Sequence, residues 1–285
     1  MSEVLTTLVQ LSALVFVLSS MLAMGLSLTV PEIIAPLSNV RLVIIALALN
    51  FIAVPLLAWG IQAVLDLDQD LYTGLVLVAT AAGAPFLPKL AQAAKGDVAF
   101  SVGLMTLLMV LTVVYMPVVL PLFLADVEVN AWDIASSLIV MMLLPLAIGL
   151  VWKARWPGTA DTLQPHMSQA STVAILFLIV GGVILAWTDI VDLVGTGGLI
   201  AAIVFLLVSL GIGYVSGGSD PTIRSVLGLG TAQRNLSAAL VVGAQNFSSE
   251  VLTYVVVIAL IGLAILLPLA GELGRRTESP AVTES

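Results

Sequence analysis

The sequence predicts an all-α polytopic membrane protein with nine transmembrane helices, and two observations lead to this fold class. Hydrophobic residues make up 60% of the 285 positions and charged residues only 9%, whereas a soluble domain is usually nearer to about a quarter charged. The apolar residues also form nine long segments, separated by short polar stretches. Because about twenty apolar residues in a helix cross the hydrocarbon core of a bilayer, each segment is expected to span the membrane.

The expected spans follow one another with short connections. They run roughly over residues 6–30, 40–65, 71–94, 98–124, 132–152, 168–187, 195–216, 221–246 and 249–270. The longest polar stretch, "KARWPGTADTLQPHMSQ", follows the fifth span and is expected to form a loop that contains His166.

We expect one transmembrane domain over residues 1–270, with a first repeat of about 6–124 and a second of about 132–270. Residues 271–285 form a polar tail whose composition is typical of a disordered segment. When spans one to four are paired with spans six to nine, the two members of each pair cross the membrane in opposite directions. The fifth span has no counterpart, so the pattern predicts an inverted repeat whose first half lacks its opening helix.

The charged residues of the connections divide by side of the membrane. One side is expected to hold the basic residues Arg41, Lys95, Lys153, Arg155, Arg224, Arg275 and Arg276. The other side has neither Lys nor Arg and holds Asp66, Asp68, Asp70, Asp126, Glu128, Asp133, Asp189, Asp192 and Glu250. Because basic residues accumulate in cytoplasmic loops, the N-terminus is expected outside and the C-terminus in the cytoplasm.

Two basic residues fall inside expected spans, Lys89 in the third and Arg234 in the eighth. No Asp or Glu falls within the apolar body of any expected span, so neither cation has an obvious counter-charge. The third span is also interrupted by Pro85 and Pro88, which lack a backbone N–H and clash with the preceding turn. A charge and a break at membrane depth are tolerated where the chain lines a cavity or is enclosed by protein.

The eighth span holds a comparable interruption, a polar island between apolar flanks. The island consists of Thr231, Gln233, Arg234 and Asn235. Two interrupted spans at corresponding places in two halves are typical of a binding site built from discontinuous helices. We therefore expect the third and eighth spans to be broken helices, with half-helix N-termini that favour a bound anion.

Composition disfavours several other classes of function. The chain has no cysteine and a single histidine, His166, which argues against a disulfide, a metal centre and a Ser-His catalytic site. The net charge of −8 argues against a nucleic-acid partner. With no carboxylate inside the spans, a membrane enzyme is disfavoured, and no catalytic residue and no metal ligand are assigned.

Four stretches occur in order within residues 15–245: "MLAMGLSLTVPEI", "LNFIAVPLLAWG", "AKGDVAFSVGLM" and "GTAQRNLSAAL". In their order and spacing they resemble the bile acid:sodium symporter family. The resemblance implies two inverted repeats with crossing helices, and the chain resembles a bacterial member with nine helices, which lacks the first. It further implies a place in the bacterial inner membrane and transport of an organic anion together with sodium.

At the sodium sites that the resemblance implies, the chain departs from the family pattern. Leu87 and Pro88 stand where Ser and Asn oxygens are implied, and Gly230 stands where a glutamate bridges both sites. Arg234 stands in place of a glutamine. Because added positive charge and a lost carboxylate both oppose sodium binding, sodium coupling in the usual family form is not expected, and no other cofactor is.

Other positions of the implied sodium sites keep side-chain oxygens. Asn50 stands in place of a glutamine, Ser101 matches a serine, and Thr106 lies beside the position of a threonine. The positions equivalent to the ion sites are thus Lys89, Asn50, Ser101, Thr106 and Arg234. The alternatives are that Asn50 bridges a kink before Pro55 and that Ser101 and Thr106 bond carbonyls of their own helix.

The predicted function is secondary active transport of a small organic anion, a carboxylate or sulfonate, across the lipid bilayer by alternating access. The residues expected to bind the substrate are Arg234, Asn235, Gln233, Lys89 and Thr231. Arg234 holds the anion bidentately in this hypothesis, and the alternative is that Arg234 bonds the carbonyls of the broken helix. Gln233 and Asn235 have a similar alternative, in which they only satisfy free backbone groups.

Three roles remain open for Lys89. In the first, Lys89 and Arg234 replace the two sodium ions. In the second, Lys89 exchanges a proton and couples transport to pH, and in the third its ammonium only extends to the cytoplasmic surface. Transport is accordingly expected to be sodium-independent or proton-coupled. The alternatives are a conventional sodium-coupled symporter and, in another class, a passive anion channel, since buried cations also attract anions through a pore.

Overall fold

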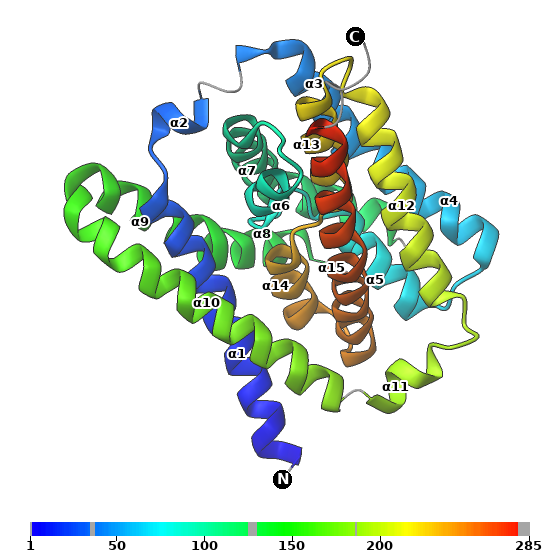
Figure 1. The fold of residues 1–285 in the computed structure, drawn as a ribbon. Coiled ribbons are helices and arrows are strands. Elements are labelled where there is room, and N and C mark those ends of the chain that lie inside the picture. The colour runs from blue at the N-terminus through cyan, green and yellow to red at the C-terminus, as the bar shows by residue number, and fades with distance from the viewer. Residues whose placement is uncertain (1, 35–37, 125–129, 186, 279–285) are drawn as a thin grey trace.

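The computed structural model describes residues 2–34, 38–124, 130–185 and 187–278, which contain helices and no strand (Figure 1). Seven helices are long and apolar enough to cross a membrane, namely Val4–Ser27, Val40–Leu65, Val98–Phe123, Ala131–Arg155, Pro157–Leu185, Gly198–Ser216 and Ser249–Thr277. The prediction of an all-α, polytopic membrane protein is confirmed. The number of nine spans stays a prediction, because the third and eighth expected spans are each divided into two shorter helices.

The helices follow the apolar segments of the sequence. In chain order they are α1 (Ser2–Ser27), α2 (Val30–Ile34), α3 (Val40–Ala48), the π-helical η2 (Leu49–Ala53), α4 (Val54–Leu65), α5 (Gln69–Thr80), α6 (Leu87–Ala93), α7 (Val98–Phe123), α8 (Ala131–Leu138), the π-helical η3 (Ile139–Leu143), α9 (Leu144–Arg155), α10 (Pro157–Leu185), α11 (Trp187–Asp192), α12 (Gly198–Ser216), α13 (Pro221–Ala232), α14 (Leu236–Asn246) and α15 (Ser249–Glu278). The segments α3–η2–α4 and α8–η3–α9 are each one continuous span.

The two interrupted spans meet at their breaks. Residues 81–86 separate α5 from α6, and residues 233–235 separate α13 from α14. The Asn235 N–H donates to the Ala81 carbonyl at 2.8 Å and so joins the two linkers. The break between α5 and α6 follows from the prolines of this span. Pro88 is tolerated in α6 because it lies in the first turn, where an N–H has no helical partner. An inverted repeat that relates the two halves stays a prediction.

The broken helices form the interior of the molecule. All residues of α5 from 71 to 80 are buried, as are residues 225–232 of α13. α15 and α7 pack on α5, and α12 packs along α13. α1, α9 and α10 pack together along another side of the molecule (Figure 1). The unpaired backbone groups of the breaks are therefore enclosed by protein, as the cost of exposing them to hydrocarbon requires.

Two polar segments differ from the expected structure. The stretch after the fifth span is not a loop, because α10 begins at Pro157, so His166 lies in a helix. Proline at the first helical position presets the backbone, and the Trp152 indole N–H donates to the Thr159 hydroxyl across the corner between α9 and α10. α15 likewise extends through the start of the polar tail, where Glu272 pairs with two arginines on its own helix.

Some expectations concern residues outside the described ranges. Asp126 and Glu128, expected on the outer side of the membrane, lie in the gap before α8, and residues 279–285 of the expected tail follow the last described residue. The side of the membrane on which each terminus lies stays a prediction.

The contact between α1 and α9 leads to a stability prediction, because it depends on glycine. A Cβ at Gly25 would lie 2.3 Å from the Leu146 carbonyl oxygen and 2.9 Å from the Gly149 Cα. We expect Gly25→Ala to lower the free energy of unfolding by about 1–3 kcal/mol through overpacking, measured as a lower melting temperature in detergent. Gly182→Ala is the control, because a Cβ there meets no heavy atom within 4 Å. Equal melting temperatures for both variants would contradict the prediction.

Candidate functional site

The linker between α5 and α6 is fixed against α7. The Ala82 N–H donates to the Thr112 hydroxyl, and this hydroxyl donates to the Ala82 carbonyl, each at 3.1 Å. Gly83 has a φ of +79°, and a Cβ there would lie 2.2 Å from the Met109 amide nitrogen. Only glycine combines this left-handed backbone with so close an approach. The linker therefore has a defined path across the interior.

Arg234 lies where the two linkers meet and is only 6% exposed. Its Nε donates to the Val78 carbonyl at 3.2 Å, and its Nη2 donates to the Ala79 carbonyl at 2.6 Å. Nη1 donates to Asn50 Oδ1 at 2.6 Å and to the Thr231 carbonyl at 3.2 Å. Nη2 makes a longer contact of 3.5 Å to the Asn50 carbonyl. We call these acceptors, the carbonyl oxygens of Val78, Ala79, Thr231 and Asn50 together with Asn50 Oδ1, the oxygen cage.

Three oxygens of the cage are available because two helices end beside Arg234. Val78 and Ala79 lie in the last turn of α5, and Thr231 lies in the last turn of α13. Carbonyls in the last turn of a helix have no partner within that helix, and among the described residues only the Val78 carbonyl of these three also accepts a backbone N–H, from Ala81 at 3.2 Å. The same ends carry the negative pole of the helix dipoles. The interruptions of the two helical spans therefore create both the hydrogen-bond acceptors and the negative potential that a buried cation needs.

The Asn50 carbonyl is released by the π-helical segment η2. Pro55 has no N–H to offer the Phe51 carbonyl, and the Val54 N–H donates one residue further back than in an α-helix. The Asn50 and Phe51 carbonyls are thereby left without their usual partners. Arg234 donates to the first, and the Tyr115 hydroxyl donates to the second. Asn50 thus accepts hydrogen bonds from Arg234 and also lies in the kinked segment before Pro55.

The guanidinium of Arg234 is fully occupied by the oxygen cage. Its five contacts equal the number of N–H donors on a guanidinium. Within the described ranges, the ion pairs involve other residues and none involves Arg234. This is the arrangement of the alternative in which Arg234 bonds the carbonyls of the broken helices. A role as the anchor of a substrate stays a prediction, and in this conformation Arg234 has no donor left for it.

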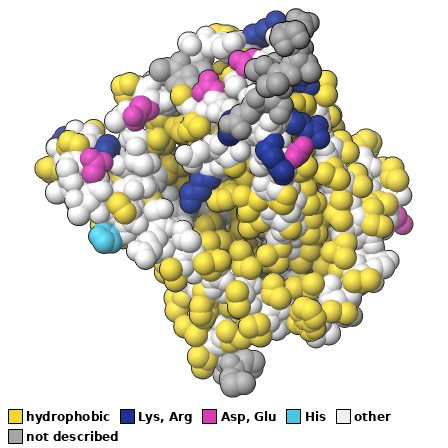
Figure 2. Space-filling view, viewed as in Figure 1, with side chains coloured by type: hydrophobic (Ala, Val, Ile, Leu, Met, Phe, Trp, Pro, Cys, Tyr) yellow, Lys and Arg dark blue, Asp and Glu magenta, His cyan; other side chains and the backbone are white. Residues whose placement is uncertain are grey.

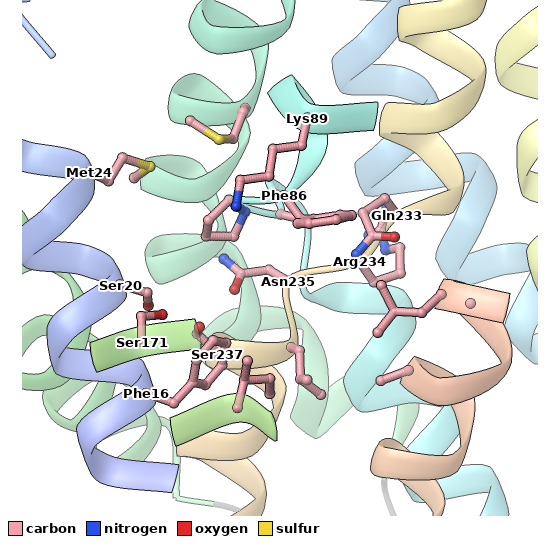
Figure 3. Close-up of a pocket in the computed structure, with 18 of the residues that line it drawn as sticks. Phe16, Ser20, Met24, Phe86, Lys89, Ser171, Gln233, Arg234, Asn235 and Ser237 are labelled. Carbon is pink, nitrogen blue, oxygen red and sulfur yellow. The ribbon is translucent and has the colours of Figure 1, made fainter. Parts of the chain in front are cut away.

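A cavity of about 590 Å³ opens beside the two linkers. Its walls come from α1 and α10 on one side and from α6, α14 and α15 on the other (Figures 2 and 3). Most of the lining is apolar, and no Asp or Glu occurs among the lining residues that the structure describes. Lys89, Gln233 and Asn235 lie near the breaks, whereas Ser20 and Ser171 lie on the wall formed by α1 and α10 (Figure 3). A solute held here would therefore meet a cation and amides near the breaks, polar side chains on the wall of α1 and α10, and apolar side chains over most of the remaining lining.

Four of the five residues expected to bind substrate line this cavity, namely Lys89, Gln233, Arg234 and Asn235. The Lys89 side chain extends into the cavity (Figure 3), is exposed, and has its ammonium 5.6 Å from the centre of the Phe86 ring. No ion pair or hydrogen bond of the Lys89 ammonium occurs among the described residues, although its backbone N–H donates to the Phe86 carbonyl. Gln233 is half-buried at the cavity wall.

Two buried polar groups at the start of α14 lack a partner. Asn235 caps α14, since its Oδ1 accepts the Ala238 N–H at 3.2 Å. Its Nδ2 and the Ser237 Oγ have no hydrogen-bond partner among the described residues, although Asn235 is 0% and Ser237 1% exposed. Both residues line the cavity (Figure 3). Since leaving a buried polar group without a partner costs about 1–3 kcal/mol, these groups indicate a place for a polar ligand.

The remaining predicted residues lie away from the cavity. The Thr231 hydroxyl donates to the Leu227 carbonyl of its own helix and faces α12, where a Cβ at Gly213 would lie 2.6 Å from it. The Ser101 and Thr106 hydroxyls donate to carbonyls within α7, as in the alternative of the sequence analysis. Their equivalence to ion sites stays a prediction.

Sequence reasoning missed the wall of the cavity formed by α1 and α10. Its residues include Phe16, Ser20, Met24 and Ser171. Sequence reasoning also missed Ser237. These small or apolar residues are common in any membrane helix, so no local signal distinguishes them.

The comparisons with known proteins identify the family of this chain. Residues 14–193, more than half of the chain, match the Sodium Bile acid symporter family. The chain belongs to this family. It is thus a transmembrane protein of a transporter family rather than of an enzyme family. The matched family is the one that the sequence motifs resemble.

Relatives of this family are distant in sequence. An uncharacterized sodium-dependent transporter, YocS, of Bacillus subtilis (strain 168) is 28% identical over 201 residues, which cover 69% of this chain and 60% of that protein. The probable sodium/metabolite cotransporter BASS3, chloroplastic, of Arabidopsis thaliana is 23% identical over 195 residues, covering 68% of this chain and 45% of that protein. The chain therefore covers less than two thirds of the length of either relative.

The family name implies sodium, and the residues present do not fit this ion. The oxygen cage is occupied by the guanidinium of Arg234. At Gly230, where the resemblance implies a carboxylate, a Cβ would lie 3.0 Å from Leu87 Cδ2 and 3.6 Å from Leu104 Cδ2. This position therefore offers no side-chain oxygen and faces apolar side chains.

The oxygen cage leads to a prediction for Asn50. We expect Asn50→Leu to lower the free energy of unfolding by about 1–3 kcal/mol, because Arg234 loses its side-chain acceptor inside the protein. Asn246→Leu is the matched control: both amides donate to the carbonyl four residues back, but only Asn50 also accepts from Arg234. Melting in detergent measures both variants, and an equal loss in both would contradict the role of Asn50 in the cage.

Proposed function

We propose that this chain is a secondary transporter that binds a small organic anion in the cavity beside the broken helices. The observation that carries the proposal is the grouping of Lys89, Asn235 and Ser237 around a cavity without acidic lining residues. Lys89 supplies a positive charge with no bound acceptor, and the other two supply unpartnered polar groups. In this proposal a carboxylate or sulfonate pairs with the Lys89 ammonium, and it accepts from Asn235 and Ser237 once a small side-chain movement exposes these two buried donors.

The position of α14 strengthens the attraction for an anion. α14 has 11 residues and begins at the cavity, with Asn235 as its cap. The N-terminus of a helix carries a partial positive charge and favours anions. Asn235 and Ser237 lie at this N-terminus, so their side chains and the helix dipole act on the same bound group.

Most of the rest of the cavity is apolar, with a few polar side chains such as Ser20 and Ser171 on the wall of α1 and α10. Phe16 and Met24 of α1, Ile175 of α10 and Ile258 of α15 contribute to the lining. All N–H groups of the Arg234 guanidinium donate to the oxygen cage, so Lys89 is the one cation of the described lining that is free to pair with the substrate. We therefore infer a substrate with a single anionic group and a largely apolar remainder.

Alternating access is favoured over a passive anion channel. The family is one of transporters, and helices broken at membrane depth are typical of sites that open alternately to the two sides. Counterflow in proteoliposomes distinguishes the two functions, because a preloaded unlabelled anion accelerates uptake of the labelled anion only through a carrier. Uptake that rises linearly with concentration and shows no counterflow would instead support the channel.

Lys89 provides the test of the anion site. Choline salts of small carboxylates and sulfonates are screened for stabilisation of the purified protein against heat, and the best binder is used for counterflow. We expect Lys89→Gln to weaken binding by about tenfold or more, since a bond to a charged group is lost. Lys153→Gln is the matched control, because Lys153 pairs with Asp161 outside the cavity. Unchanged affinity in Lys89→Gln would overturn the proposed site.

A further inference from the structure

The oxygen cage has the composition of a site for a monovalent metal cation. Its oxygens belong to backbone carbonyls and one amide side chain, and the described part of the cage contains no carboxylate. In transporters with broken helices, unwound carbonyls and the C-terminal ends of half-helices coordinate monovalent cations. Here the ends of α5 and α13 provide such carbonyls. A neutral cage of this kind suits one positive charge rather than two.

The tethered guanidinium occupies this cage more strongly than a dissolved ion can. Arg234 follows α13 by two residues, so its guanidinium remains near the cage whenever the chain is folded. Tethering gives a group an effective concentration that a free ligand reaches only at millimolar levels or above. The geometry on the opposite side is fixed too, since Asn50 Nδ2 donates to the Ala46 carbonyl at 3.0 Å and thereby directs Oδ1 toward Arg234.

We propose that Arg234 is a built-in cation that permanently occupies a monovalent cation site, so that this chain neither binds sodium at the breaks nor requires sodium for transport. Removal of the guanidinium opens the cage to a free cation. This inference deepens the proposed function, and its relevance to transport rests on that function. The positive charge that stabilises the two helix ends is thus part of the protein, and sodium is not needed to hold the broken helices together.

Sodium binding by the purified protein gives the first test, and it needs no substrate. We expect the wild type to bind no ²²Na⁺ above background, and to melt at the same temperature in sodium chloride and in choline chloride. Saturable ²²Na⁺ binding by the wild type, or stabilisation by sodium but not choline, would overturn the proposal whatever the variants do.

Chemical rescue gives the second test. We expect Arg234→Ala to melt at a lower temperature, and millimolar guanidinium or sodium to raise that temperature while choline does not. Arg224→Ala is the matched control, since Arg224 lies in α13 over the Tyr214 ring and outside the cage. A folded Arg234→Ala whose melting temperature responds equally to guanidinium, sodium and choline would contradict the inference.

Arg234→Lys keeps the test decisive where Arg234→Ala does not fold. It retains a tethered cation, so we expect melting to remain independent of sodium; a sodium-dependent melting temperature in this variant would overturn the inference. Failure of the proposed function is separate, because it appears as loss of anion binding or counterflow in the wild type. Wild-type counterflow that requires sodium would contradict the built-in cation and leave the anion site intact.

Discussion

The hydrogen bonds of the buried Arg234 guanidinium are the interaction on which the centre of this protein depends. They connect the ends of α5 and α13 to the π-helical turn η2, three elements that otherwise expose carbonyls in the interior. Neither the cation nor the broken helices are tolerable alone at membrane depth, because each leaves polar groups without partners. Together they satisfy one another without a carboxylate.

The two cations inside the expected spans therefore have different roles. Arg234 is enclosed and has spent all its donors, whereas Lys89 is exposed to the cavity and has no bound acceptor among the described residues. A guanidinium suits the first position, since its planar fork donates in several fixed directions. An ammonium suits the second position, since its flexible stem can follow an anion. The two positive charges therefore lie in separate places, Arg234 in the oxygen cage and Lys89 in the cavity.

Membership of the Sodium Bile acid symporter family sets the transporter class, while the departures of this chain fall at the ion sites that the resemblance implies. Gly230, Leu87 and Arg234 are three such departures, and the structure places them around the same breaks. Apolar packing against Gly230 and hydrogen bonding by Arg234 take up the space and the oxygens that a free cation would use.

The sequence by itself determined the helical class, the positions of the breaks and the two cations without counter-charges, because apolar length, proline and charge are local properties. Four of the cavity residues were predicted from it. The helical structure of the polar start of α10 and of the first residues of the tail in α15 was not predicted. Only the tertiary structure decided which cation is enclosed and which is free. The partners of Arg234 lie as far as 184 positions away in the chain, at Asn50, and the lining of α1 and α10 carries no local signal. Backbone carbonyls, moreover, belong to every residue, so only their arrangement in space makes them a cation site.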